Sequence, residues 1–94
     1  MSELKCEIVR DGHRGSEMLA DVKDVRGKIH SIRVERAFLT DLGNDQFSLP
    51  MAIVAEDRAR EMFLVEFDHE PETGQNRIWV YSSQMTEMPI GASP

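Results

Sequence analysis

The chain has 94 residues, 40% of them hydrophobic and 30% charged, and a formal net charge of −6 at pH 7. This length supports one small hydrophobic core and excludes a second one, and the acidic charge disfavours non-specific binding to nucleic-acid phosphates. The single cysteine excludes an internal disulfide framework, and no segment has the apolar length of a membrane span or the N-terminal apolar run of a secretion signal.

The N-terminal third alternates between apolar and polar residues. Leu4 to Arg10 has this period of two and predicts a strand, and residues 11–16 contain two glycines and predict a turn. Residues 17–25 fit one face of a helix, but they also fit a strand whose apolar residues alternate. We favour the strand, paired through a tight turn at Asp24–Gly27 with residues 28–35, because strands that are neighbours in sequence usually pair.

The central segment predicts a strand, a helical turn and a second strand. Ile32 and Val34 are the expected inward pair of the first strand, and residues 36–40 are expected to form one helical turn that places Phe38 and Leu39 in the core. Residues 41–45 form a cluster of turn-forming residues. Because Pro50 cannot donate a hydrogen bond to a sheet, we place the regular part of the next strand at Met51–Ala55.

Residues 62–67 and 77–81 give the clearest strand signal. Phe63, Val65 and Phe67 share one face of the first, and Ile78 and Val80 share one face of the second. The polar connection between them, residues 68–76, is expected to be a flexible loop, although loops of this length also carry function. Residues 82–85 predict a last short turn.

The spacing of these segments predicts an all-β, mainly antiparallel fold with one or two short helical turns. We expect a small five- to six-stranded barrel over residues 1–86, followed by a flexible C-terminal tail over residues 87–94. The strand that contains Trp79 and Val80, with the turn at residues 82–85, resembles the end of SH3-like folds. This resemblance concerns the fold alone and implies no binding residues.

No motif for catalysis, metal binding or cofactor binding is evident. Cys6, His13, His30 and His69 lack the spacing of metal ligands, and three consecutive residues such as 68–70 cannot all face one ion from a strand. A nucleophilic pair of Cys6 with His30 or His13 depends on strand register, and we favour Cys6 as a small buried hydrophobic residue. We therefore predict no catalytic, metal or cofactor-binding residues.

Basic and aromatic residues give the best remaining signal. Arg26, Lys28, Arg33 and Arg36 surround one predicted hairpin, and Arg58, Arg60 and Arg77 are expected near each other at a second end. If Ile78 and Val80 point inward, then Trp79 and Tyr81 share the outward face with Arg77, which is the composition of an interaction hot spot. The alternative, which the usual burial of large aromatic residues favours, is that Trp79 packs under a loop and Arg77 pairs with a glutamate.

These observations give three hypotheses of function. The first is a cytoplasmic, non-enzymatic module that binds a protein partner, or a second copy of itself, through Trp79, Tyr81, Arg77 and Arg33 or through an exposed strand edge. The second is a small nucleic-acid-binding barrel, which the acidic charge disfavours but does not exclude. The third, ranked last, is a small enzyme or metal protein that uses Cys6 and the histidines.

Overall fold

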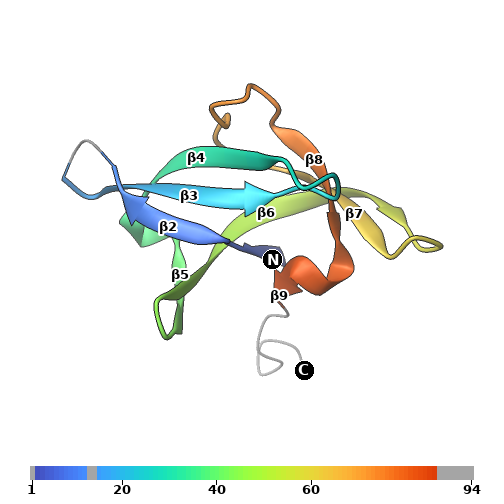
Figure 1. Cartoon of the computed structure of the whole chain (residues 1–94), viewed down its shortest axis with the longest axis horizontal. Helices are drawn as coiled ribbons and strands as arrows, with labels where there is room; N and C mark the ends of the chain where they lie inside the picture. The colour runs from blue at the N-terminus through green and yellow to red at the C-terminus, as the bar shows by residue number, and fades with distance from the viewer. Residues whose placement is uncertain (1, 13–14, 87–94) are drawn as a thin grey trace.

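The strands form two antiparallel sheets that face each other across one core (Figure 1). The computed structural model describes residues 2–12 and 15–86. Within them the elements, in chain order, are β1 (Ser2–Lys5), β2 (Ile8–Asp11), β3 (Glu17–Lys23), β4 (Ile29–Glu35), the 3₁₀ turn η1 (Arg36–Phe38), β5 (Thr40–Gly43), β6 (Gln46–Asp57), β7 (Met62–Glu66), β8 (Arg77–Tyr81), the 3₁₀ turn η2 (Ser82–Gln84) and β9 (Met85–Thr86).

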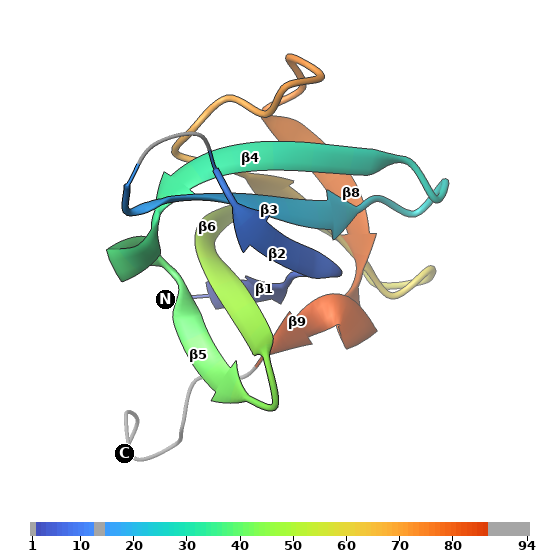
Figure 2. The same cartoon turned by 60° about the vertical axis from the view of Figure 1, so that its left-hand side comes forward.

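The larger sheet has the strand order β8-β7-β6-β1-β9, with β5 also paired to β6, and the smaller sheet has the order β2-β3-β4. Figure 2 shows the smaller sheet lying across β6 and β1. The predicted antiparallel β class and the two short helical turns are confirmed. Neither sheet closes into a barrel among the described strands.

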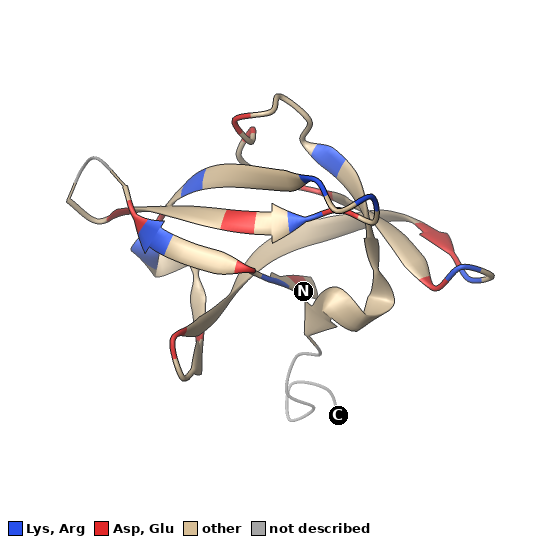
Figure 3. Cartoon of the chain, in the orientation of Figure 1, with Lys and Arg blue, Asp and Glu red and all other residues tan. Residues whose placement is uncertain are grey.

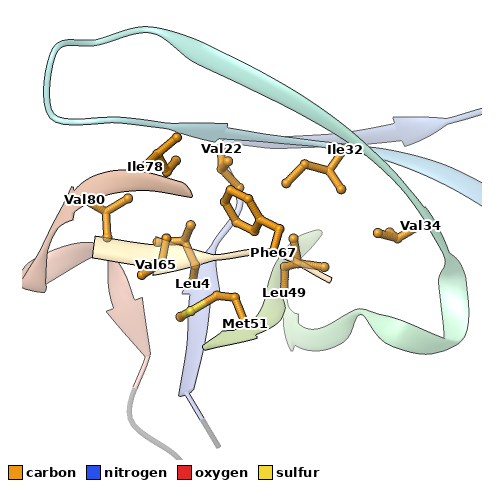
Figure 4. Packing of buried hydrophobic residues seen from close by; sticks show 10 residues of the cluster. All are labelled: Leu4, Val22, Ile32, Val34, Leu49, Met51, Val65, Phe67, Ile78 and Val80. Atoms are coloured by element: carbon orange, nitrogen blue, oxygen red, sulfur yellow. The ribbon is translucent and has the colours of Figure 1, made fainter. Parts of the chain in front are cut away.

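The core consists of apolar side chains that project from both sheets into the space between them (Figure 4). Its buried members are Leu4, Val22, Ile32, Val34, Leu49, Met51, Val65, Phe67, Ile78 and Val80. Phe63 and Leu39 pack against this cluster while remaining partly exposed. The predicted inward pairs on β4 and β8 are therefore confirmed, since period-two alternation places alternate side chains on one face of a sheet.

The ambiguous segment at residues 17–25 is a strand. β3 pairs with β4 along its whole length, with Ala20 opposite Ile32, and the alternating residues Met18, Ala20 and Val22 are all buried. Gly27 closes the connecting turn with a φ of 85°, a conformation that favours glycine. The predicted hairpin is therefore confirmed.

The first predicted strand is wrong as one element. Residues 4–10 break at Cys6 and Glu7 into β1 and β2, which belong to different sheets. The backbone N–H of Cys6 donates to Phe47 of the larger sheet and that of Glu7 donates to Asp21 of the smaller one. The chain crosses between the sheets at this point, and Ile8 consequently leaves the core and is 59% exposed.

The helical turn after β4 is confirmed, but one of its expected core residues is not in the core. Phe38 is 52% exposed, and its ring lies edge-on to His69 with the ring centroids 5.6 Å apart. Leu39 instead packs against the core. The turn is a single short 3₁₀ segment, so it presents only one of two adjacent side chains to the interior.

The expected start of the strand near Pro50 is also wrong. The expected turn cluster at residues 41–45 contributes to β5, and the turn itself lies at Asn44 and Asp45, which both have positive φ, as a tight hairpin turn requires. β6 starts at Gln46 and runs through Pro50. Two strands pair with the same edge of β6: β5 pairs with residues 46–48 and β7 pairs with residues 52–57. Neither strand pairs with the stretch between these ranges, so this edge accommodates Pro50, which has no N–H to donate.

Two further predictions concern the limits of the fold. The expected C-terminal tail, residues 87–94, lies outside the described residues. No helix in the described part of the chain has the length and apolar character needed to cross a membrane.

Candidate functional site

Strand β8 carries the aromatic and basic residues that the sequence singled out. Ile78 and Val80 are buried in the core, so Arg77, Trp79 and Tyr81 occupy the opposite face of the strand. Trp79 is half-buried, whereas Arg77 is exposed and Tyr81 is 46% exposed. The alternation of β8 thus presents one guanidinium and two aromatic rings on the outside of the larger sheet.

A pocket of about 300 Å³ lies beside this face, between the β3–β4 turn, the end of the loop before β8, and β8 itself. Figure 3 shows basic residues both at the β3–β4 turn and at the start of β8. The residues that line the pocket are Asp24, Val25, Arg26, Lys28, Gln75, Arg77, Ile78 and Trp79. Three of these carry a positive charge and one carries a negative charge, in a protein whose net charge is −6.

The turn that forms one wall of the pocket is organised by Asp24. Its Oδ1 accepts hydrogen bonds from the backbone N–H groups of Arg26 (2.9 Å) and Lys28 (3.0 Å), and its Oδ2 lies 2.9 Å from Nε2 of His30. Burial would by itself raise the pKa of Asp24, but the hydrogen bonds from His30, Lys28 and Arg26 outweigh that effect and hold it below its ordinary value. The carboxylate therefore stays ionised at neutral pH and its charge is compensated from within the fold.

His30 connects this turn to the loop before β8. Its side chain is fully buried, with Nε2 facing the Asp24 carboxylate and Nδ1 lying 2.7 Å from the Thr73 hydroxyl. An ionised carboxylate only accepts hydrogen bonds, so Nε2 donates to Asp24, and Nδ1 shares a hydrogen bond with the Thr73 hydroxyl. A carboxylate, an imidazole and a hydroxyl in this order also occur in nucleophilic catalysis. Here they join two walls of the pocket.

The loop at residues 68–76 packs against β4, contrary to the expectation of a flexible connection. The backbone N–H of Glu72 donates to the carbonyl of Ser31 on β4 at 2.8 Å, and Pro71 is buried. The N–H of Gly74 closes a turn onto Pro71 at 2.8 Å. The loop therefore has several fixed points, and Gln75 is held at the pocket.

The cations of the pocket retain unused donors. The Nε of Arg77 donates to Glu66 at 3.0 Å, and Nζ of Lys28 donates to Oε1 of Gln75 at 3.1 Å. Among the described residues, the Nη atoms of Arg77 and the guanidinium of Arg26 make no hydrogen bond or ion pair, so these groups are available to an anionic ligand.

Arg33 is not part of this site. It lies on β4 of the smaller sheet, where its guanidinium forms ion pairs with Glu17 at 3.5 Å and Glu72 at 3.3 Å. It lines none of the pocket. Arg77 and Trp79 thus lie together at the pocket, and Tyr81 lies beyond them on β8. Arg33 lies apart from these three residues, on the other sheet.

The expected second basic cluster does not form. Arg58 and Arg60 lie in the turn between β6 and β7, where they pair with Glu56 and Asp57. Met62, at the start of β7, lies opposite Tyr81, whereas Glu66 at its end lies opposite Arg77. The antiparallel register therefore places Arg77 at the opposite end of the β7–β8 pair from Arg58 and Arg60.

Cys6 is partly buried and packs against the core, rather than lying fully inside it as expected. Burial first, and then the nearby charges of Asp21 and Glu3, raise the pKa of Cys6 to about 12. The thiolate, which is the reactive form, is therefore nearly absent at neutral pH. The part of the chain that the structure describes contains no group of three or more His, Cys, Asp or Glu side chains placed to hold a metal ion; His13 lies outside it.

Sequence reasoning missed Asp24, His30, Thr73 and Gln75 as members of the site. One signal was present, because His30 alternates with Ile32 and Val34 on the inward face of a strand. A polar side chain in such a position must find hydrogen-bond partners in the interior. The identity of those partners depends on how the loop at residues 68–76 folds back, which no local pattern determines.

Comparison with known proteins gives no relative from which a function can be transferred. No protein-family model matches the chain, no curated protein matches it, and no solved structure matches it. The assignment of function therefore rests on the geometry and charge of the pocket and of the outer face of β8.

Proposed function

We propose that this protein is a non-enzymatic binding module of the cytoplasm that recognises an acidic segment of a protein partner. Its binding surface is the outer face of β8, with Arg77, Trp79 and Tyr81, together with the adjoining pocket. The observation that carries this proposal is the grouping of Arg26, Lys28 and Arg77 around one pocket beside Trp79. Aromatic rings next to arginine are typical of interaction hot spots, and unneutralised cations select acidic partners.

We also propose that the two facing sheets form an SH3-like small barrel. Two backbone hydrogen bonds support this interpretation: the first lies where the chain crosses from the larger sheet to the smaller one, and the second joins the turn of the smaller sheet to β8 of the larger one. The N–H of Glu7 donates to Asp21 at 2.7 Å, and the N–H of Val25 donates to the carbonyl of Trp79 at 2.9 Å. Small barrels of this kind bind ligands on their outer strands and loops, but the fold alone does not select a partner.

Fluorescence anisotropy with a labelled peptide of glutamate residues around a central leucine tests the function. We expect saturable binding at low salt that weakens as salt is added, because the contacts are electrostatic. Trp79→Ala should abolish the binding, and Arg77→Gln, which keeps the core intact, should weaken it. Phe38→Ala, which removes an exposed aromatic ring outside this surface, is the matched control and should bind normally.

Two outcomes would contradict the proposal. Equal binding by the Trp79→Ala, Arg77→Gln and control proteins would remove this surface from consideration. Tighter binding of a single-stranded oligonucleotide than of the acidic peptide would favour the nucleic-acid hypothesis, in which Trp79 stacks on bases.

Sedimentation of the protein alone reports self-association. A dimer that Trp79→Ala leaves intact would indicate pairing elsewhere, such as at β2, whose outer edge no described strand pairs.

A further inference from the structure

The pocket beside β8 presents hydrogen-bond donors from three separate parts of the chain, and two of these parts supply cations. Arg26 and Lys28 come from the β3–β4 turn and Arg77 comes from the start of β8, while Gln75 adds a neutral amide from the loop between β7 and β8. Trp79 forms part of the wall, and the volume is about 300 Å³. This volume is at the lower end of the range for small-molecule sites, so it suits one functional group with the stem that carries it.

The charges in the pocket are arranged to attract an anion. The only carboxylate in its lining, Asp24, is occupied by His30 and by two backbone N–H groups, so it competes little for the cations. Arg77 gives only its Nε to Glu66, and the guanidinium of Arg26 has no partner among the described residues. Lys28 uses one of its three ammonium donors on Gln75.

The walls of the pocket are held in place by hydrogen bonds. The N–H of Val25 donates to the carbonyl of Trp79 at 2.9 Å, which fixes the turn against β8. The buried ring of His30 fixes the same turn against Thr73, and the N–H of Gln75 lies 3.4 Å from the Thr73 hydroxyl oxygen. A ligand therefore meets walls whose backbone is already in position, which lowers the entropic cost of binding.

We propose that this pocket binds a phosphate monoester dianion, carried on a phosphorylated side chain of the protein partner. The inference rests on the proposed function and names the group that the site recognises. A phosphate monoester at neutral pH carries nearly two negative charges and three acceptor oxygens, which match the three cations, Arg26, Lys28 and Arg77. A single carboxylate needs only one guanidinium.

The surroundings of the pocket favour a monoester over the phosphodiesters of nucleic acid. A nucleic-acid strand needs a row of cations along its backbone, but Arg33, Arg58 and Arg60 are all paired with carboxylates away from the pocket. Outside the pocket the chain has a net negative charge, since the whole chain carries −6 and the pocket lining is positive. The indole of Trp79 in the pocket wall favours a phosphate carried on an aromatic ring over one on a short aliphatic stem.

Phenyl phosphate is the simplest probe, and Trp79 is the only tryptophan of the chain, so its fluorescence reports directly on the pocket. We expect a saturable change in fluorescence, stronger binding of phenyl phosphate than of inorganic phosphate, and weaker binding of the monoanionic diester methyl phenyl phosphate. Arg26→Gln and Arg77→Gln should each weaken the affinity at least about threefold, through the loss of charge-assisted hydrogen bonds. Arg58→Gln, in the distant β6–β7 turn, is the matched control and should not change it.

Three outcomes would overturn the inference: no response to phenyl phosphate, equal affinity for the monoester and the diester, or equal effects of Arg26→Gln and Arg58→Gln. Failure of this inference is distinguishable from failure of the proposed function. If the acidic peptide still binds in a manner that depends on Trp79 while phenyl phosphate does not bind, the binding face stands and only its preference for phosphate falls. Amide NMR spectra of each variant establish that the fold is intact.

Discussion

Arg33 and Arg77 are both exposed arginines on strands, and both flank a carboxylate across the sheet, yet their surroundings differ. Arg33 lies between Glu17 and Glu72, and each of its Nη atoms faces one of these carboxylates. Arg77 gives one nitrogen to Glu66 and lines a pocket. Whether a cation is available to a ligand therefore depends on the neighbours that the fold assigns to it, and a count of basic residues does not reveal it.

The His30 link between the two walls of the pocket provides the largest expected effect. His30→Ala removes a fully buried ring together with its hydrogen bonds to Oδ2 of Asp24 and to the Thr73 hydroxyl, so we expect a loss of about 2–4 kcal/mol in the free energy of unfolding. Urea denaturation measures this loss. His69→Ala, at an exposed position where the ring forms an aromatic pair with Phe38, should change the stability by less than about 1 kcal/mol. Equal stabilities of the two variants would mean that His30 does not hold the walls together.

Charge reversal sharpens the comparison of the two arginines. Arg77→Glu places a negative charge at the pocket, and we expect it to lower the affinity for the acidic peptide about tenfold or more, since the loss of one charged hydrogen bond is worth about 1.5–3 kcal/mol. Arg33→Glu should lower it less than about twofold, because Arg33 is outside the pocket. Fluorescence anisotropy at one fixed salt concentration measures both. Similar losses of affinity in the two variants would show that the net charge of the protein, and not the position of the arginine, determines the affinity for the peptide.

The acid dependence of stability tests the turn that carries Arg26 and Lys28. The pKa of Asp24 is lowered in the folded protein, so the stabilisation it provides is present above its unfolded pKa of about 3.9 and is lost as the pH falls through the lower folded value. Asp24→Asn should therefore be less stable than the wild type at pH 7, and the difference should shrink below about pH 4. Thermal unfolding across this range measures it. A difference that is constant with pH would contradict the assigned role, and Asp68→Asn is the exposed control.

The smallest expected effect is on the stability contributed by Arg33. Its two ion pairs have N–O distances of 3.5 and 3.3 Å, and the side chains of Arg33 and Glu72 are about half exposed, whereas that of Glu17 is 23% exposed. Exposed pairs of this kind contribute about 0–1 kcal/mol, so Arg33→Ala should change the unfolding free energy by no more than about that amount. Denaturation at low and high salt checks this. A loss of several kcal/mol would mean that Arg33 and the loop at residues 68–76 are coupled more strongly than their distances indicate.

Part of the fold was predictable because the relevant pattern is local. Alternating apolar residues identified β3, β4, β7 and β8 and the inward pairs on them, since a strand sends successive side chains to opposite faces. The failures were at the points where strands change partners. Ile8 lies outside the core because the chain crosses between the sheets just before it. Pro50 lies inside β6 because neither β5 nor β7 pairs with that part of the β6 edge.

The candidate site was predictable only in part for the same reason. Alternation along β8 placed Arg77, Trp79 and Tyr81 on one face, but it carried no information about Arg26 and Lys28 lying across from them. Those two residues are about fifty positions earlier in the chain, and the hydrogen bond from Val25 to Trp79 brings them to the pocket. By its local sequence, Arg33 is as good a candidate for a free cation as Arg77. In the folded protein, the loop that carries Glu72 brings that carboxylate to within 3.3 Å of the Arg33 guanidinium.

The local pattern alone predicts a small antiparallel β domain, because apolar residues alternate with a period of two in several short segments, and a sheet buries such alternate side chains on one face. Long-range packing sets which charges meet, which loop covers His30, and which of the described arginines keep nitrogens without an ion-pair partner. Contacts between residues far apart in the chain depend on the register and packing of whole sheets, and a local pattern of residues does not specify that register.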